Sequence, residues 1–144
     1  MDVVKFICTK EDFKGEADVR VVKFDAFENY DMLNDFFGKH DKKLMEDKAT
    51  YFDGYDFQAW NDYVIIENGE IISRAGIWKV NGTEWEVAGV STLPEYRKQG
   101  YGEAVVQSCI AKILESGKTA TCTTKTTNTA MINTALKAGF KIVK

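Results

Sequence analysis

Apolar and polar residues alternate along this chain with two different periods, one typical of helices and one typical of strands. After Gly102 the apolar positions fall at i, i+3, i+4, i+7 and i+8, which predicts an amphipathic helix ending at Gly117, a plausible left-handed cap. Its apolar members are Val106, Cys109, Ile110, Ile113 and Leu114. A second helix is predicted from Asn29 to about Asp47, with Met32, Phe36, Phe37, Leu44 and Met45 as apolar members.

Runs of β-branched and aromatic residues predict strands before and after these helices. Two Asn-Gly pairs, at 68–69 and 81–82, predict turns that divide the segment from Tyr63 to Leu93 into three antiparallel strands. Further strands are predicted at residues 3–8, 19–24, 119–124 and 140–143, and a last helix from Asn128 to Gly139. These elements together predict an α/β (α+β) fold with a mixed, mostly antiparallel central sheet flanked by helices.

The chain of 144 residues, 44% hydrophobic and 12% aromatic, is long enough for one domain with its own core. No linker, repeat or low-complexity tract divides it, and it contains one proline, Pro94. No apolar run approaches the roughly 20 residues that cross a bilayer, and the N-terminus lacks a signal-peptide core. We therefore expect a single domain over residues 1–144 in a cytoplasmic protein with no membrane partner.

Charge is distributed unevenly along the chain, whose formal net charge is −3. Residues 1–72 carry 9 Lys/Arg and 17 Asp/Glu, a net of −8, whereas residues 73–144 carry 10 and 5, a net of +5. A basic half suits a polyanionic cofactor and an acidic half attracts a cationic amine, although ordinary surface variation explains the asymmetry about as well. The acidic half argues against nucleic acid as a partner.

Cysteine and histidine contribute little to the expected chemistry. Cys8, Cys109 and Cys122 are widely spaced and form no CxxC pattern, so the sequence suggests neither a disulfide framework nor a metal site, and we expect buried thiols. The single histidine, His40, stands in a charged stretch and is expected to be solvated.

A turn with the pattern RxxGxG, residues 97–102, lies between the predicted 85–93 strand and the helix that follows. Gly100 and Gly102 allow a ligand to approach the backbone, and the first N–H groups of a helix have no acceptor within it. Such a turn favours phosphate, while an ordinary tight turn before a helix is the alternative. Neither the GxxxxGK(S/T) phosphate loop nor the GxGxxG dinucleotide spacing occurs.

The order of strand, RxxGxG turn and helix resembles the acetyl-CoA-binding core of the GNAT superfamily of acyl-CoA-dependent N-acyltransferases. Residues 128–140 are similar to a second signature of that family, an Asn-x-x-Ala helix that ends in Gly-Phe. The resemblance extends from about residue 63 to residue 143. It implies an acetyl-CoA-binding core at 63–144, a variable acceptor-side part at 1–62, and a V-shaped opening of the sheet after the fourth core strand.

The resemblance also implies which residues bind acetyl-CoA. Val90, Ser91 and Thr92 match the strand segment whose main chain binds the pantetheine arm, although a buried strand end fits these residues equally well. The residues that match the pyrophosphate-binding turn are Arg97, Lys98, Gln99, Gly100, Tyr101 and Gly102, and we expect the Tyr101 side chain to pack rather than bind. Asn128 matches a residue near the pantetheine arm and is also a typical helix N-cap.

Glu86 matches the strand position at which some family members carry a catalytic glutamate. Glu84, two residues earlier, points to the same face of a strand. A carboxylate acts as a base on the amine if burial or charge raises its pKa, or if water carries the proton onward. Both glutamates are alternatively exposed partners of Arg74 or Lys79 on the neighbouring strand.

Two features depart from the family pattern. Ala135 stands where many members have the tyrosine that protonates the leaving thiolate, and no tyrosine follows Tyr101. The sequence also stops at Lys144, where the family usually adds a final strand. Either the N-terminal strand replaces that strand or the acceptor side is rebuilt, and a sheet edge left open favours a homodimer.

The expected function is an N-acetyltransferase that transfers an acetyl group from acetyl-CoA, without a metal, to a primary amine of a small molecule or peptide. Direct attack in a ternary complex is expected, because Cys109 lies on a helix stripe and Cys122 inside a strand, where neither is a suitable nucleophile. One alternative is a non-catalytic CoA-binding regulatory module, and another is a domain that binds a different phosphorylated ligand. The acceptor is not encoded in any motif.

Overall fold

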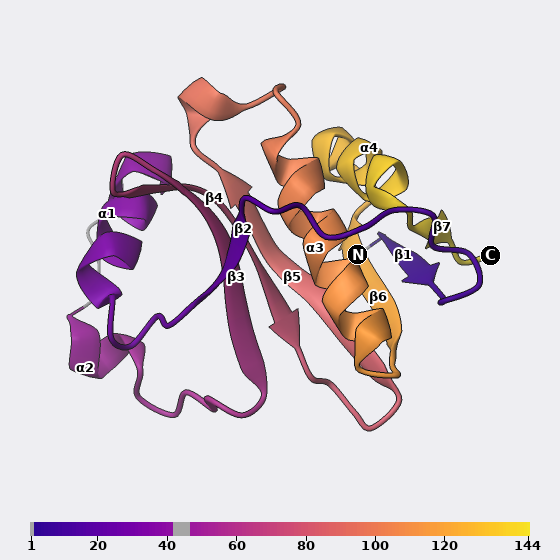
Figure 1. The fold of residues 1–144 in the computed structure, drawn as a ribbon, viewed down its shortest axis with the longest axis horizontal. Coiled ribbons are helices and arrows are strands. Elements are labelled where there is room, and N and C mark those ends of the chain that lie inside the picture. The colour runs from indigo at the N-terminus through magenta and orange to yellow at the C-terminus, as the bar shows by residue number, and fades with distance from the viewer. Residues whose placement is uncertain (1, 42–46) are drawn as a thin grey trace.

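The computed structural model describes residues 2–41 and 47–144, and its centre is a seven-stranded sheet with the order β2-β3-β4-β5-β6-β1-β7 (Figure 1). The strands are β1 (Val3–Cys8), β2 (Val21–Phe24), β3 (Trp60–Glu67), β4 (Glu70–Trp78), β5 (Glu84–Thr92), β6 (Thr119–Lys125) and β7 (Lys141–Ile142). All neighbouring strands are antiparallel except β5 and β6, which are parallel. The predicted mixed, mostly antiparallel sheet is therefore confirmed.

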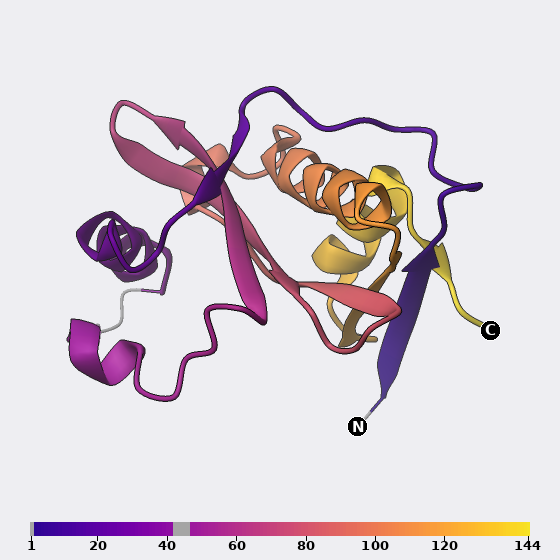
Figure 2. The same cartoon turned by 60° about the horizontal axis from the view of Figure 1, so that its bottom comes forward.

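Helices cover the sheet on opposite faces. The helices are α1 (Tyr30–Asp41), α2 (Lys48–Tyr51), α3 (Tyr101–Glu115) and α4 (Thr129–Ala138). In Figure 2 the helices α1 and α2 lie on one side of the β2–β3–β4 ribbon, and α3 and α4 lie together on the other. Within the described residues, no helix is long and apolar enough to cross a membrane.

The three central antiparallel strands follow from two short turns. Asn68 and Gly69 both have positive φ, 52° and 77°, as a type I′ hairpin turn between β3 and β4 requires. The side-chain oxygen of Asn81 accepts hydrogen bonds from the N–H groups of Thr83 and Glu84, both at 2.8 Å, and so closes the second turn. Both predicted Asn-Gly turns are confirmed.

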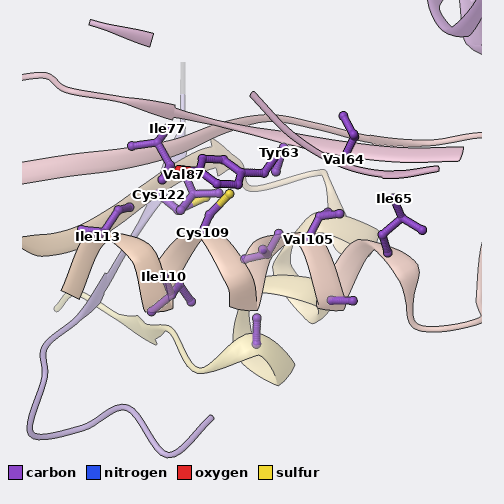
Figure 3. Packing of buried hydrophobic residues seen from close by; sticks show 14 of the residues in the cluster. Tyr63, Val64, Ile65, Ile77, Val87, Val105, Cys109, Ile110, Ile113 and Cys122 are labelled. Atoms are coloured by element: carbon purple, nitrogen blue, oxygen red, sulfur yellow. The ribbon is translucent and has the colours of Figure 1, made fainter. Parts of the chain in front are cut away.

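The main core lies between α3 and the sheet. Figure 3 shows Val105, Cys109 and Ile113 of α3 beneath strand residues such as Tyr63 and Val87, all of them buried. A fully buried side chain of this size contributes about 1.5–3 kcal/mol relative to an exposed one. At the end of α3, the N–H of Gly117 bonds to Leu114 O at 3.0 Å and the N–H of Lys118 to Ile113 O at 3.2 Å. This is a Schellman cap with Gly117 left-handed at φ 80°, as predicted.

The N-terminal strand β1 lies between β6 and β7 in the sheet. β1 pairs with β6 over its whole length, from Val3 opposite Lys125 to Cys8 opposite Ala120, and its other edge pairs with the short β7. Of the two alternatives, replacement by the N-terminal strand is thus the correct one. β1 fills the edge of β6 that a missing strand would leave open, and the homodimer stays a prediction.

Several predicted boundaries differ from the structure. The described part of the first helix extends to Asp41, and the predicted members Leu44 and Met45 lie outside the described residues. Strand β2 begins at Val21, because Val19 is 96% exposed and has no partner strand. Strand β3 begins at Trp60, three residues earlier than predicted, because Trp60 still pairs with Trp78 at the far end of the hairpin.

Candidate functional site

A cleft opens where β5 and β6 diverge. These parallel strands pair only from Glu84 opposite Thr119 to Glu86 opposite Thr121, and beyond this point their facing edges separate. The space between them has a volume of about 770 Å³ and is lined by β5, β6, the turn before α3, and α4. Because β1 pairs with the other edge of β6, that strand keeps its hydrogen bonds while it diverges from β5. The V-shaped opening predicted after the fourth core strand is therefore present.

A β-bulge reshapes β5 beside the opening. In the register of β4 and β5, Gly76 lies opposite Ala88 and Arg74 opposite Ser91, so Gly89 and Val90 together face Ala75. Gly89 adopts φ 63°, a left-handed conformation that glycine reaches without strain. The bulge takes one peptide group of β5 out of the regular ladder at the edge of the cleft.

The segment predicted to bind a pantetheine arm lines this cleft. Val90, Ser91 and Thr92 are half-buried, and among the described residues no strand pairs with their edge toward β6. On the other side β4 holds the segment, where the Ser73 hydroxyl lies 2.8 Å from that of Thr92 and 3.3 Å from the main-chain oxygen of Ser91. An extended ligand rich in amides can therefore pair with the exposed edge as an additional strand does.

The turn after β5 presents a row of main-chain N–H groups. Lys98 and Gly100 are left-handed, with φ 62° and 86°, and α3 begins at Tyr101. No hydrogen bond within the described part of the chain uses the N–H of residues 98–103, and the first intrahelical bond is donated by Ala104 to Gly100 O at 3.0 Å. Unpaired N–H groups at the positive end of a helix dipole bind anions.

Gly102 keeps this turn open to the cleft. A Cβ at this position would lie 3.6 Å from the hydroxyl of Thr92 and 3.7 Å from Cγ2 of Thr134, on the opposite wall of the cleft. A larger side chain would therefore fill the space in front of the N–H groups. The free donors, the glycine and the cleft along the free edge of β5 fit a diphosphate joined to an amide-rich chain, which is the chemistry of coenzyme A.

The side chains of the turn have different roles from its main chain. Arg97 donates from Nε to Thr92 O at 3.1 Å, and Gln99 donates to Glu95 O at 3.1 Å, so both brace the loop. Tyr101 points away from the cleft, with its hydroxyl 3.4 Å from a carboxylate oxygen of Glu67, in agreement with the expected packing role. Lys98 is exposed on the rim of the cleft.

Helix α4 forms the far wall of the cleft. The Asn128 side chain accepts a hydrogen bond from the N–H of Met131 at 3.1 Å and also lines the cleft, so its predicted capping role is confirmed. Ala135 is fully buried and does not line the cleft. The sequence analysis missed several lining residues of this helix, namely Ala130, Met131, Asn133, Thr134 and Lys137. The spacing of three or four residues between them, as from Ala130 to Asn133 and Lys137, was the available signal.

Glu86 lies at the narrow end of the opening, in the last residue pair between β5 and β6. Burial raises the pKa of its carboxyl group, while a hydrogen bond from Thr123 and the positive charge of Lys5 lower the pKa. Thr123 lines the cleft and lies opposite Lys5 of β1 in the sheet. Glu86 is not itself among the residues that line the cleft.

The alternative in which the two glutamates pair with Arg74 or Lys79 is wrong. Arg74 forms a buried ion pair with Asp62 at 2.5 Å, and Lys79 lies 4.9 Å from the ring centre of Trp85. Of the ion pairs between described residues, none includes Glu84 or Glu86.

The cysteines are unsuited to nucleophilic chemistry. Cys8, Cys109 and Cys122 are buried and unbonded to one another, as expected. Burial raises the pKa of the Cys109 thiol and raises that of Cys122 to about 12, so both are thiols at neutral pH. Among residues 2–41 and 47–144, no group of three His, Cys, Asp or Glu side chains is placed to hold a metal ion.

The comparison with known structures places this geometry among acetyltransferases. A GNAT-family protein from Novosphingobium aromaticivorans superposes with a TM-score of 0.74 at 18% identity, over 99% of this chain and 60% of its own. A GNAT-family acetyltransferase from Colwellia psychrerythraea gives 0.76 at 12% identity, over 99% and 53%. An aminoglycoside 6'-N-acetyltransferase solved in complex with coenzyme A gives 0.56 at 17% identity, over 68% and 57%.

The chain thus spans little more than half the length of these solved structures, and at such identities the likeness shows the fold. Among curated proteins, none has a sequence that matches this chain significantly. The model of the Acetyltransferase (GNAT) family matches residues 27–140, which is most of the chain. The split β5–β6 pair, the glycine turn before α3 and this match agree, and the chain belongs to the GNAT family of acetyltransferases.

Proposed function

We propose that the protein is an N-acetyltransferase that moves the acetyl group of acetyl-CoA to a primary amine of a small molecule or peptide. The observation that carries the proposal is the cleft between β5 and β6, which ends at the unpaired N–H groups of residues 98–103. Its walls combine a free strand edge for an amide chain with an anion-binding turn. Acetyl-CoA, the acetyl donor of the family, has both of these parts.

In this proposal the main chain holds most of the co-substrate. The free edge of residues 90–92 pairs with the pantetheine arm, and the N–H groups of residues 98–102 bind the diphosphate. The side chains of Lys98 and Lys137, both on the cleft, add positive charge, and Asn128 caps α4 while facing the same space. Arg97 and Gln99 act indirectly, because their hydrogen bonds hold the loop in shape.

Glu86 is proposed as the general base. The ammonium form of the acceptor first loses a proton, and a carboxylate whose pKa is raised by burial accepts it more readily than an ordinary glutamate. The neutral nitrogen then forms a bond to the acetyl carbon while the carbon–sulfur bond breaks. The nitrogen gives up a second proton, and the leaving sulfur takes one. The bulge at Gly89 and Val90 supplies main-chain groups near the reacting carbonyl.

The source of the proton for the sulfur differs from that in many similar enzymes, because Ala135 has no hydroxyl and is sealed from the cleft. We propose that water supplies the proton, assisted by hydroxyl groups that line the cleft, among them Thr123 and Thr134. The same observation favours a second function, a regulatory module that binds coenzyme A without turnover.

The three buried free thiols suit a reducing compartment, so the proposal includes a cytoplasmic location.

Isothermal titration with acetyl-CoA tests the proposed site. Gly102→Val places a branched side chain between Thr92 and Thr134, and we expect it to abolish measurable binding. Gly82→Val is the matched control, because Gly82 lies in an exposed turn with no atom within 4 Å of its added Cβ and should bind as the wild type does. Equal affinity of the Gly102 variant and the wild type would disprove the site.

Turnover then separates the two functions. Acetyl-CoA consumption with a panel of primary amines is expected for the enzyme, whereas binding without consumption across the panel supports the regulatory module. Stabilisation by ATP or NAD, but not by coenzyme A, in a thermal-shift comparison would instead favour a different phosphorylated ligand.

A further inference from the structure

A platform of aromatic and acidic side chains borders the cleft on the face of the sheet toward α1. Ala88 lines the cleft, and in the sheet it lies opposite Gly76, which lies opposite Asp62. Side chains directly opposite one another share a face, so these three positions form one row.

The neighbouring row on the same face contains Trp60, Trp78 and Glu86, which lie opposite one another across β3, β4 and β5. Two tryptophans, Asp62 and the proposed base Glu86 therefore share one surface. We call this surface the platform, consisting of Trp60, Asp62, Gly76, Trp78, Glu86 and Ala88.

Glycines make room for the ring of Trp60. A Cβ at Gly76 would lie 2.0 Å from Cζ2 of this ring, so the indole lies directly over the β4 backbone. A Cβ at Gly89, on the β5 bulge, would lie 3.4 Å from the same ring. The ring thus reaches from β3 across β4 to the edge of the cleft, and its Nε1 donates to Asp62 at 3.0 Å, which fixes its orientation.

The carboxylate of Asp62 has unused hydrogen-bonding capacity. Asp62 is only 2% exposed, and its two hydrogen bonds, from Trp60 and from Arg74, both end on Oδ1. In the hydrogen bonds between described residues, Oδ2 accepts none. A carboxylate oxygen accepts hydrogen bonds, so an unused one beside a tryptophan ring favours a ligand with an N–H donor.

We propose that the platform binds the acceptor, and that the acceptor is a cationic amine with an aromatic or cyclic body and no carboxylate group. This rests on the proposed acetyl transfer and names its acceptor class. The body stacks on Trp60, and the ammonium group lies toward Asp62 and Glu86. Glu84, on the same face, and the net charge of −8 over residues 1–72 disfavour an acceptor that carries its own carboxylate.

Binding of three probes to the wild-type protein saturated with coenzyme A tests this inference without turnover. The probes are 2-phenylethylammonium, phenylalanine, which adds a carboxylate to the same ring and amine, and propylammonium, which lacks the ring. Titration calorimetry is expected to give the lowest Kd for 2-phenylethylammonium, by about tenfold over each of the others. A Kd for phenylalanine or propylammonium as low as that for 2-phenylethylammonium would overturn the inference.

Variants test whether the platform causes the difference in Kd between the probes. Trp60→Leu should raise the Kd of 2-phenylethylammonium about tenfold and leave that of propylammonium unchanged. Gly76→Ala, which must displace the Trp60 ring, is expected to act in the same direction and carries the test if Trp60→Leu does not fold. Trp85→Leu is the matched control, because Trp85 lies on the opposite face, against Lys79 and Lys118.

Equal effects of Trp60→Leu and Trp85→Leu would overturn the inference. A failure of the proposed acetyl transfer can be distinguished from a failure of this inference. If 2-phenylethylammonium binds as expected but no amine is acetylated, the acceptor site stands and the acetyl transfer does not.

Discussion

The cleft and the platform beside it are built from different parts of the polypeptide. On the proposed co-substrate side, the free edge of β5, the turn at residues 98–102 and the start of α3 present main-chain groups, and their side chains mostly brace the loop. On the proposed acceptor side, the platform presents side chains held in place by packing and by one buried ion pair. Recognition by the main chain depends on the spacing of glycines, so the sequence contains a motif for it. Recognition by the platform depends on side chains that strand pairing brings together, so the sequence contains no motif for it.

The first 62 residues add an aromatic cluster on the same side of the sheet as the platform. Ring contacts within about 6 Å join Phe27, Tyr30, Tyr51, Phe52, Tyr55 and Phe57. Burial raises the pKa of the Tyr55 hydroxyl, with Asp62 as the next cause, so this ring lies near the Asp62–Arg74 pair. Phe27 and Phe57 remain 41% and 51% exposed, which shows a loosely covered cluster beside the tightly closed core under α3.

One element of the first 62 residues belongs to the other side. Strand β1 pairs with β6 along its whole length and places Lys5 opposite Thr123, next to the proposed base. The expected acceptor-side part, residues 1–62, is therefore continuous in sequence but not in space. Its residues 3–8 pair with β6, which belongs to the proposed co-substrate half.

The largest expected effect tests the proposed chemistry at the border of the two sides. Glu86→Gln keeps the size of the side chain and removes the base, so kcat/KM should fall by about 10² to 10⁴, with an unchanged Kd for acetyl-CoA. Steady-state kinetics and calorimetry measure the two values. Glu84→Gln, on the same face but nearer the closed end of β5, is the matched control with near wild-type activity.

Stability provides a check on the fold of the Glu86 variant. A carboxyl group with a raised pKa in the folded state stabilises the protein below its unfolded-state pKa, and this contribution is lost as the pH rises through the folded-state pKa. At neutral pH the charged Glu86 is therefore the less favourable form. Glu86→Gln is expected to have an equal or higher Tm, and a clear fall in Tm would contradict the assigned shift.

The next effect tests whether β1 belongs to the co-substrate half. Phe6 is fully buried and its ring centre lies 6.1 Å from that of Phe140, so Phe6→Ala should lower the free energy of unfolding by about 3–5 kcal/mol. Phe57→Ala, in the aromatic cluster, removes a half-exposed ring and should cost much less. Chemical denaturation measures both, and equal losses would contradict the difference between the closed core and the loose cluster.

Much of the fold was predictable because local chemistry determined it. The turn at Asn68-Gly69 and the Gly117 cap need left-handed residues, and α3 shows a clear apolar period. Long-range pairing was not readable, because no local signal says that residues 3–8 insert between β6 and β7 rather than extend another edge. For the same reason the platform was missed, since Trp60, Gly76 and Glu86 come together only through strand register.

A smaller effect concerns the far wall of the cleft. Asn128 caps α4 through the N–H of Met131, so Asn128→Ala should lower the free energy of unfolding by about 1 kcal/mol. Asn128→Asp keeps the capping acceptor but adds negative charge to the cleft, so it should keep the stability and weaken acetyl-CoA binding. Chemical denaturation measures the free energy of unfolding of both variants, and calorimetry measures their Kd for acetyl-CoA. If both values are the same in the two variants, Asn128 has only one of these roles.

The smallest expected effect tests whether β1 influences the chemistry as well as the sheet. Lys5 lowers the pKa of the Glu86 carboxyl group, and its influence is smaller than those of burial and of the hydrogen bond from Thr123. Removing its charge should raise that pKa, so a larger fraction of Glu86 is protonated at a given acidic pH. Lys5→Met should then move the acidic limb of the pH profile of kcat/KM to higher pH.

Lys10→Met provides the comparison for this shift, because Lys10 is exposed beyond the end of β1 and is not among the groups that affect Glu86. High salt should shrink the difference between Lys5→Met and the wild type, since the charge acts partly through solvent. If the acidic limb moves to lower pH, or moves equally in both lysine variants, the titrating group is not Glu86. The N-terminal strand would then serve only to complete the sheet, and the contrast between a main-chain side and a side-chain side would apply to the acetyl donor but not to the base.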